Sequence, residues 1–195
     1  MAHGGWRVTV RNAGTISPLF VARVLETTAG DVSGLLIVGS GSLARIAGAT
    51  VSSGRKIVVQ GAMGMAAAVA LGFSRSSGRP TIVLEGDGNF LMGAPVCHWM
   101  AAISSPTLHV VVCNGQYLTS GGQALPVNAE YIAHGRKVDK PEEFIQQVRE
   151  WSAESRYYRL LFVMTPIIKV GRLSRPRRSL MQQCLSIRKI SRAEA

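Results

Sequence analysis

The sequence predicts an α/β fold, a parallel sheet with helices on both faces. Short apolar runs rich in Val, Ile and Leu, such as residues 35–39 and 81–85, alternate with longer helical patterns. Nearly continuous apolar runs of this length are typical of strands buried on both faces of a parallel sheet. The alternation with helices indicates crossover connections between such strands. Apolar residues make up 47% of the 195 residues and charged residues 17%, so the chain can form a full core.

Local signals define the individual elements. Ser17 is a candidate N-cap, and Pro141 fits the first turn of a late helix that begins with acidic residues. Pro166 marks an edge or a bulge in the last strand. The predicted helices cover residues 17–28, 63–73, 91–103 and 142–154. The predicted strands cover residues 35–39, 55–60, 81–85 and 107–113, then 160–164 with 167–170 as one interrupted strand, and a long functional loop covers 114–128.

The charge distribution suggests three regions: a flexible N-terminal arm (1–16), one domain (17–171) and a basic C-terminal tail (172–195). The net charge is +11, and the tail is rich in arginine. We expect the tail to be a solvated, partly disordered end; docking on an acidic partner and nucleic-acid binding are the alternatives. Nucleic acid is disfavoured because no aromatic residue accompanies the arginines after residue 171.

Cysteine usage and hydropathy indicate a cytoplasmic protein. Cys97, Cys113 and Cys184 are odd in number and unclustered, as expected of reduced thiols. The apolar windows are too short to span a membrane, and the N-terminus lacks the apolar stretch of a signal peptide. We therefore expect no membrane association.

Oxygen ligands and glycines follow two of the predicted strands. Asp87 lies between Gly86 and Gly88 after the strand at 81–85, and Asn114 follows the strand at 107–113. The spacing leaves room for a crossover helix, so both side chains can lie at the same edge of neighbouring parallel strands. Carboxylate and amide oxygens suit Mg²⁺, and the glycines allow the backbone to approach phosphate oxygens. This pattern predicts a metal and diphosphate site.

The Gly86-Asp87-Gly88 triplet followed by Asn114 resembles the thiamine diphosphate motif. The resemblance implies that Asp87 and Asn114 bind Mg²⁺ through their side chains and that Gln116 contributes its backbone carbonyl. It extends over roughly residues 17–170 and covers the diphosphate-binding domain of that family.

The segment 61–72 resembles the part of the family that holds the cofactor bent. There a bulky apolar side chain between glycines supports the bent form, and Met63 lies at that place. Core packing is the alternative for Met63. We expect Met65 to be a core residue of the Ala-rich helix.

The loop at 114–123 resembles that of phosphonopyruvate decarboxylases, with sulfopyruvate decarboxylases as near relatives. Tyr117 departs from the histidine expected at its place. Thr119, Ser120 and Gln123 are candidate substrate contacts, with capping of turns as the alternative. The residues expected to contact the cofactor are Gly39, Ser40, Gly41, Met63, Gly64, Gly86, Gly88, Asn89 and Tyr117.

One feature of the family is missing from the chain. Activation of the cofactor requires a glutamate on a separate pyrimidine-binding domain, and no second αβ unit with a matching glutamate is found. Glu26 is expected at a surface position of the first helix, and Glu85 precedes the metal loop on the wrong domain. The resemblance therefore implies a hetero-oligomer in which a partner subunit supplies the catalytic glutamate and this chain supplies no catalytic residue. The implied activity is decarboxylation of an anionic 2-oxo acid, phosphonopyruvate or sulfopyruvate, to an aldehyde and CO₂.

Two other functions remain open. Gly39, Gly41 and Ala44 fit a dinucleotide fingerprint, which would indicate a nicotinamide oxidoreductase, but residues 50–64 contain no acidic residue for the ribose. A non-catalytic subunit of the thiamine fold is the second alternative. A soft-metal site at His109 and Cys113, with Cys97 or His98, is less favoured than core packing because four-ligand zinc spacing is absent.

Overall fold

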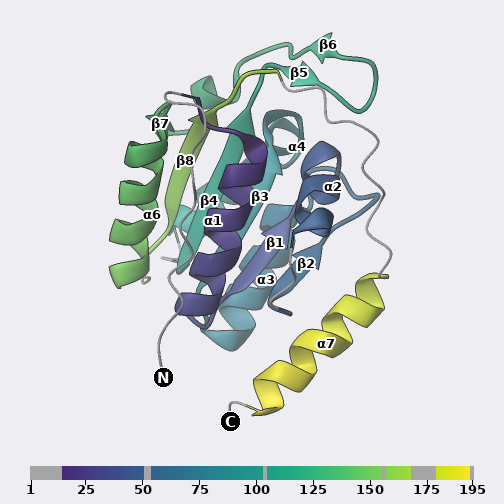
Figure 1. Ribbon diagram of the computed structural model, residues 1–195, viewed down its shortest axis with the longest axis vertical. Coiled ribbons are helices and arrows are strands. Elements are labelled where there is room, and N and C mark those ends of the chain that lie inside the picture. Colours follow the sequence, from purple (N-terminus) through teal and green to yellow (C-terminus); the bar gives the residue numbers. More distant parts are fainter. Residues whose placement is uncertain (1–14, 51–53, 103–104, 155–156, 168–178, 194–195) are drawn as a thin grey trace.

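The computed structural model describes residues 15–50, 54–102, 105–154, 157–167 and 179–193. Its centre is a six-stranded sheet in the order β2-β1-β3-β4-β8-β7, with every neighbouring pair parallel (Figure 1). This confirms the predicted fold class. The helices are α1 (Pro18–Asp31), α2 (Ser42–Ala49), α3 (Ala66–Ser77), α4 (Asp87–Gly93), α5 (Pro95–Ala102), the 3₁₀ helix η1 (Ala129–Tyr131), α6 (Pro141–Glu154) and α7 (Leu180–Ala193). The strands are β1 (Leu35–Val38), β2 (Lys56–Val58), β3 (Thr81–Gly86), β4 (Thr107–Cys113), β5 (Gln116–Tyr117), β6 (Gln123–Ala124), β7 (Arg136–Val138) and β8 (Arg159–Met164).

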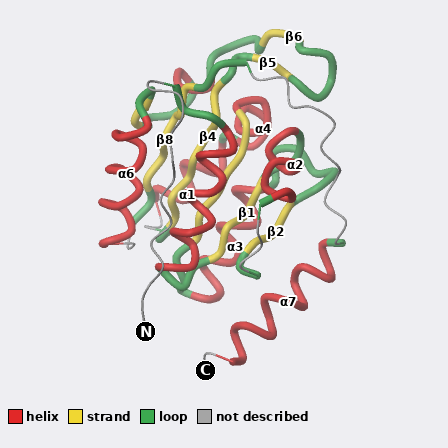
Figure 2. Tube along the Cα trace, in the orientation of Figure 1, coloured by secondary structure: helices red, strands yellow, loops and turns green. Residues whose placement is uncertain are grey.

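Helices cover both faces of the sheet (Figure 2). Leu36 and Val38 of β1 face a core shared with α1, α2 and α6, whereas Leu35 and Ile37 face a core shared with α3 and α5. A third cluster joins α4 and α5 to β4 and β8. Because alternate residues of each inner strand are buried on opposite faces, the strands are mostly apolar rather than alternating between apolar and polar residues.

Helix boundaries follow the local chemistry. The Ser17 hydroxyl accepts a hydrogen bond from the Phe20 amide at 3.2 Å, which confirms the predicted N-cap. The helix predicted from residue 63 begins at Ala66, after a turn in which Gly64 has a φ of 79°. The single helix predicted at 91–103 is instead two helices, α4 and α5, and α4 begins four residues earlier. Pro95 starts the second of them, because its ring cannot donate the hydrogen bond that would continue α4.

The remaining differences lie late in the chain. Strand β7, which was not predicted, pairs in parallel with β8 and forms one edge of the sheet. The predicted loop at 114–128 contains a short antiparallel pairing of β5 with β6. The last strand ends at Met164; residues 165–167 are not strand, and 168–170 lie outside the described residues.

Part of the predicted basic tail forms α7, a helix that was not predicted. It runs beside β2, the other edge strand (Figure 1). The Gln183 side chain is buried; its Oε1 accepts the Val58 amide at 2.6 Å, and its Nε2 donates to the Val58 carbonyl at 3.4 Å. Gln183 therefore pairs with backbone groups of an edge strand as a neighbouring strand would. The predicted domain boundaries stay predictions, since most of the arm and residues 172–178 lie outside the described residues.

The surface position predicted for Glu26 is wrong. Glu26 is 8% exposed and pairs with Lys56 at 3.2 Å. Lys56 Nζ also donates to the Ala47 carbonyl and to Thr50 Oγ1. Glu26 of α1 thus neutralises Lys56, the first residue of β2. Because Lys56 also contacts the end of α2, it connects α1 with α2. In the part of the chain that the structure describes, no helix is long and apolar enough to cross a membrane.

Candidate functional site

The carboxyl edge of the sheet brings Asp87 and Asn114 together. Asp87 is the first residue of α4, immediately after β3, and Asn114 follows β4, the parallel neighbour of β3. Asp87 Oδ2 accepts the backbone amides of Asn114 at 2.8 Å and of Gly115 at 2.7 Å, and its Oδ1 accepts the Gly88 amide at 2.9 Å. The carboxylate therefore joins the ends of two adjacent strands.

Asp87 is a buried carboxylate, 3% exposed. Burial raises its pKa, and the amides of Gly115, Asn114 and Gly88 oppose this shift. No Lys, Arg or His of the described chain is ion-paired with it. A buried anion without a basic partner is unfavourable unless another cation neutralises it, so Asp87 fits a bound metal ion.

Of the other two predicted metal ligands, Asn114 lies next to Asp87, whereas the Gln116 carbonyl accepts the Leu118 amide at 3.1 Å. Asn114 Oδ1 accepts the Gln116 amide at 2.9 Å, which fixes the side chain and leaves the second lone pair of its oxygen. No group of three or more His, Cys, Asp or Glu side chains that could hold a metal ion is found among the described residues. One carboxylate, one amide and one backbone carbonyl are hard oxygen donors suited to Mg²⁺, which commonly completes its shell with phosphate oxygens and water.

Asn89 connects three segments of the site. Its Oδ1 accepts the Ser40 hydroxyl at 3.0 Å and the Gly64 amide at 3.2 Å, and its Nδ2 donates to the Ser40 carbonyl at 3.1 Å. Ser40 follows β1 and Gly64 precedes α3, so Asn89 ties both loops to α4. The sequence places Asn89 among the residues expected to contact the cofactor, and that contact stays a prediction; in the structure its side-chain amide bonds to protein groups. Its role is to position the loops.

Gly88 is required by Tyr117. A Cβ on Gly88 would lie 2.6 Å from Tyr117 Cε1 and 3.5 Å from Met63 Cε. The glycine therefore allows the Tyr117 ring to pack on the first turn of α4, with the end of Met63 nearby. Met63 is 40% exposed, so its side chain lies at the rim of this cluster rather than in the core. Met65 is 47% exposed, and the prediction that it belongs to the core is wrong.

Two of the other predicted glycines, Gly64 and Gly39, are also crowded. A Cβ on Gly64 would approach Met92 Cβ to 2.8 Å, and one on Gly39 would approach Glu85 Cβ to 2.9 Å. Gly41 has a φ of 92° and lies beside Thr119, whose Oγ1 would be 3.7 Å from a Cβ there. Gly86 has open space around its missing side chain.

The candidate substrate residues lie on the exposed β5–β6 turn. Gln123 Nε2 donates to the Ser120 carbonyl at 2.9 Å, and Ser120 Oγ lies 3.4 Å from the Tyr117 carbonyl. These contacts stabilise the turn itself, which is the alternative role that the sequence suggests for Ser120 and Gln123. Thr119 beside Gly41 is the member of the set that faces the loop after β1.

A buried polar chain, which the sequence did not reveal as such, lies beneath this edge. Glu85 Oε1 is 2.7 Å from His109 Nε2, and His109 Nδ1 is 3.1 Å from the Tyr158 hydroxyl. The second oxygen of Glu85 has no hydrogen-bond partner. The absence of a metal cluster among the described residues favours core packing of His109 and Cys113 over a soft-metal site.

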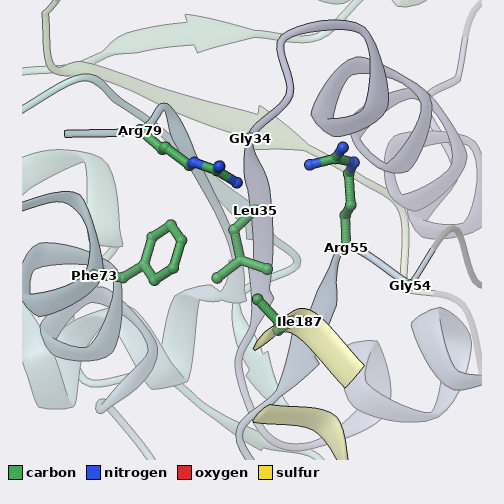
Figure 3. A pocket seen from close by; sticks show the side chains of 7 residues that line it. All are labelled: Gly34, Leu35, Gly54, Arg55, Phe73, Arg79 and Ile187. Carbon is green, nitrogen blue, oxygen red and sulfur yellow. The ribbon is translucent and has the colours of Figure 1, made fainter. Parts of the chain in front are cut away.

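A small pocket lies at the opposite end of the sheet (Figure 3). It is lined by Gly34, Leu35, Gly54, Arg55, Phe73, Arg79 and Ile187. Leu35 begins β1, whereas Gly39 follows its end, so the pocket is separated from Asp87 by the length of the strand. It is not the site that the glycines and Asp87 form.

A parallel α/β sheet with glycine loops, a buried carboxylate and a facing asparagine at its carboxyl edge defines a cofactor-binding domain suited to a diphosphate. Residues 39–158 match the family model of the thiamine pyrophosphate enzyme C-terminal TPP binding domain, and the chain belongs to this family. Family membership assigns the glycines after β1 to a thiamine diphosphate domain and replaces the nicotinamide alternative. No curated protein matches the chain.

Solved structures of other enzymes share the fold. The thiamine diphosphate-dependent 4-hydroxybenzoylformate decarboxylase of Rhodococcus jostii RHA1 is 19% identical with a TM-score of 0.69, over 86% of this chain and 36% of that one. A 2-oxoglutarate:ferredoxin oxidoreductase from Magnetococcus marinus is 12% identical with a TM-score of 0.61, over 88% of this chain and 74% of that one. The chain thus spans about a third of the decarboxylase.

Proposed function

We propose that this chain is the diphosphate- and magnesium-binding subunit of a two-component thiamine diphosphate-dependent decarboxylase. The observation that carries the proposal is the contact between Asp87 and the Asn114–Gly115 backbone at the carboxyl edge. It holds a buried, unneutralised carboxylate where the diphosphate of the cofactor is expected in this family.

The residues have separate roles in the proposed site. Asp87 and Asn114 would bind Mg²⁺ through their side chains and Gln116 through its carbonyl, while Met63 would support the bent cofactor. Asn89 fixes the loops that carry Ser40 and Gly64. When bound, thiamine diphosphate supplies the carbon nucleophile and the electron sink for decarboxylation. The proposed role of this chain is therefore to position the cofactor and to supply the charged group that holds its metal ion.

The carboxylates near the sheet support the need for a partner. Glu85 is buried against His109, Glu26 is paired with Lys56, and Asp87 is held by backbone amides. Each of these side chains already has a structural role on this domain. We therefore propose that the activating glutamate comes from a pyrimidine-domain subunit, which would correspond to sequence that the longer decarboxylase carries outside the region of similarity.

For the substrate we propose an anionic 2-oxo acid, with phosphonopyruvate and sulfopyruvate as the first to assay. Support comes from the Ser-Gly-Gly-Gln end of the loop at 120–123 and from the decarboxylase activity named for the Rhodococcus neighbour. Thr119, exposed beside Gly41, is the proposed hydrogen-bond donor to the substrate.

The test is calorimetric titration of thiamine diphosphate with Mg²⁺ into the chain and its Asp87→Asn variant. We expect magnesium-dependent binding that weakens by at least about tenfold in the variant, because the carboxylate proposed to bind the metal loses its charge. Asp31→Asn, which alters an exposed aspartate at the end of α1, is the matched control and should bind normally. Equal affinity of Asp87→Asn and Asp31→Asn would refute the metal site.

A second arm addresses turnover. The chain is mixed with a candidate pyrimidine-domain protein, and CO₂ release from the two 2-oxo acids is measured. Tight cofactor binding without CO₂ release in the mixture would favour the alternative of a non-catalytic subunit.

A further inference from the structure

A chain of buried polar side chains crosses three strands beneath the candidate site. Glu85 lies near the end of β3, His109 lies in β4, and Tyr158 directly precedes β8, the next strand in the sheet order. Glu85 and His109 are each 1% exposed. Buried polar groups are unfavourable unless they are paired, and the proposed function assigns no role to these three. Their arrangement around the metal loop, residues 86–88, indicates one.

The His109 ring is fixed at both of its nitrogens. Nε2 lies 2.7 Å from Glu85 Oε1, and Nδ1 lies 3.1 Å from the Tyr158 hydroxyl. An ionised carboxylate can only accept, so Nε2 donates the shorter bond. Burial raises the pKa of Tyr158, and the nearby Cys97 and Glu85 raise it further, so the phenol stays a neutral hydroxyl. Because the two bonds lie on different nitrogens, the ring cannot rotate without breaking one of them.

His109 contacts the chain on both sides of the metal loop. Glu85 lies two residues before Asp87, and Phe90 lies three residues after it, one turn along α4. The Phe90 ring meets the His109 ring edge to face, with centroids 5.6 Å apart and planes at 63°. Phe90 is fully buried and also packs on Phe162 of β8. The metal loop is therefore held between two contacts with one ring.

The contact with Glu85 is the more demanding of the two. The second oxygen of Glu85 has no partner in the described part of the chain, so His109 supplies the one hydrogen bond that the structure shows for this buried carboxylate. Loss of that bond would leave a buried charge unpaired, which is strongly unfavourable. The end of β3 would then have to shift, and Asp87 would shift with it.

We infer that His109 is a positioning residue for the Asp87 carboxylate. It holds the junction of β3 and α4 from beneath, through Glu85 and Phe90, so that Asp87 stays where Asn114 and Gly115 meet it. The inference deepens the proposed metal site and rests on it. Removal of groups that orient metal ligands lowers metal affinity by roughly 10–100-fold.

The test begins with hydrogen exchange of the Asn114 and Gly115 amides, measured without metal or cofactor. Both amides donate to Asp87 Oδ2, at 2.8 and 2.7 Å, so their exchange reports the position of the carboxylate. The variants are His109→Gln and His109→Leu, which both lack the ring; only glutamine keeps an N–H for Glu85. We expect the two amides to exchange about tenfold faster in His109→Leu than in His109→Gln. Equal exchange in the two variants would overturn the inference.

Thr107→Val is the control for a general loss of stability. Thr107 is fully buried at the other end of β4, and its hydroxyl bonds to Thr81 at 2.7 Å and to Ser105 at 2.8 Å. The substitution removes two buried hydrogen bonds from the same strand but leaves the junction of β3 and α4 intact. If the Asn114 and Gly115 amides exchange no faster in His109→Leu than in Thr107→Val, His109 has no specific hold on Asp87.

Cofactor affinity gives the second readout. In calorimetric titration of thiamine diphosphate with Mg²⁺, His109→Leu should bind about tenfold more weakly than Thr107→Val, and His109→Gln should recover part of the loss. Equal affinity of wild type and His109→Leu would refute the inference and leave the proposed function standing. A wild type that does not bind the cofactor would refute the proposed function, and the exchange comparison would still decide whether His109 positions Asp87.

Tyr158→Phe extends the test to a milder change. It removes one hydroxyl and keeps the ring, so it replaces His109→Leu if that variant does not fold. Without the bond to Nδ1 the imidazole is held only by Glu85, and the Asn114 and Gly115 amides should exchange faster than in wild type. Unchanged exchange in a folded Tyr158→Phe would contradict the proposed role of the chain.

Discussion

Removal of the Asn89 side chain should loosen the whole candidate site. Asn89→Ala removes three hydrogen bonds, to the Ser40 hydroxyl, the Ser40 carbonyl and the Gly64 amide, at 3.0 to 3.2 Å. Asn89 is 8% exposed, so water cannot easily replace them. The loops after β1 and β2 would lose their connection to α4.

The magnitude follows from these contacts. A hydrogen bond contributes about 1 kcal/mol net, and a buried donor left without a partner costs about 1–3 kcal/mol. Three bonds, one of which satisfies the buried Gly64 amide, give a loss of about 3 kcal/mol in the free energy of unfolding. For a chain of this size the melting temperature should fall by about 6–12 °C.

The assay combines thermal unfolding with calorimetric titration of thiamine diphosphate and Mg²⁺. The control is Asn128→Ala, because Asn128 is exposed and makes no side-chain cap at η1; its melting temperature should not change. Cofactor affinity should fall by about tenfold or more in Asn89→Ala only, as when groups that orient metal ligands are removed. If Asn89→Ala melts within about 2 °C of Asn128→Ala, the proposed role of Asn89 in joining the loops is wrong.

Two further substitutions test contacts that fix the fold around the site. Gln183→Ala should accelerate hydrogen exchange of the Val58 amide and lower stability by about 1–3 kcal/mol, because that amide donates to Gln183. Met181→Ala, at a position of α7 that is 74% exposed, should change neither, and unchanged exchange in Gln183→Ala would show that Gln183 does not hold α7 at the edge of β2. Gly88→Ala should displace the Tyr117 ring, since the new Cβ would lie 2.6 Å from it, and it should weaken cofactor binding in titration. The double variant with Tyr117→Ala should recover part of this lost affinity. A double variant that binds as weakly as Gly88→Ala would contradict the steric explanation.

The sequence was sufficient to predict the Asp87–Asn114 pair because its signal is local. Each residue directly follows an apolar strand, and parallel strands place their carboxyl ends at one edge. The Ser17 cap is local in the same way. Where a helix begins within a few residues, the side chains of those residues decide where its first turn starts.

The features that the sequence did not predict depend on contacts between residues far apart in the chain. Gln183 pairs with Val58 across 125 residues of sequence, and nothing near either residue indicates the pairing. Glu26 did carry a signal, because Ala22, Glu26 and Ala29 follow a helical spacing whose other members are buried. In the structure its buried carboxylate pairs with Lys56 of β2, which lies 30 residues later in the sequence. Met65 belongs to an Ala-rich segment that resembles a core helix, but the glycine turn at 64 delays the helix and leaves Met65 exposed.

Helix α4 makes several of the contacts that build the candidate site. Asp87 joins the strand ends, Gly88 accommodates Tyr117, Asn89 holds the two glycine loops, and Met92 faces outward. Consecutive residues of a helix point in different directions, so a seven-residue helix can contact all of these neighbours at once. The same geometry makes the contacts interdependent, because a shift of α4 that relieves strain at one residue moves the others. Substitutions at Asp87, Gly88 and Asn89 should therefore be non-additive in both stability and cofactor affinity, as expected for residues in one contact network.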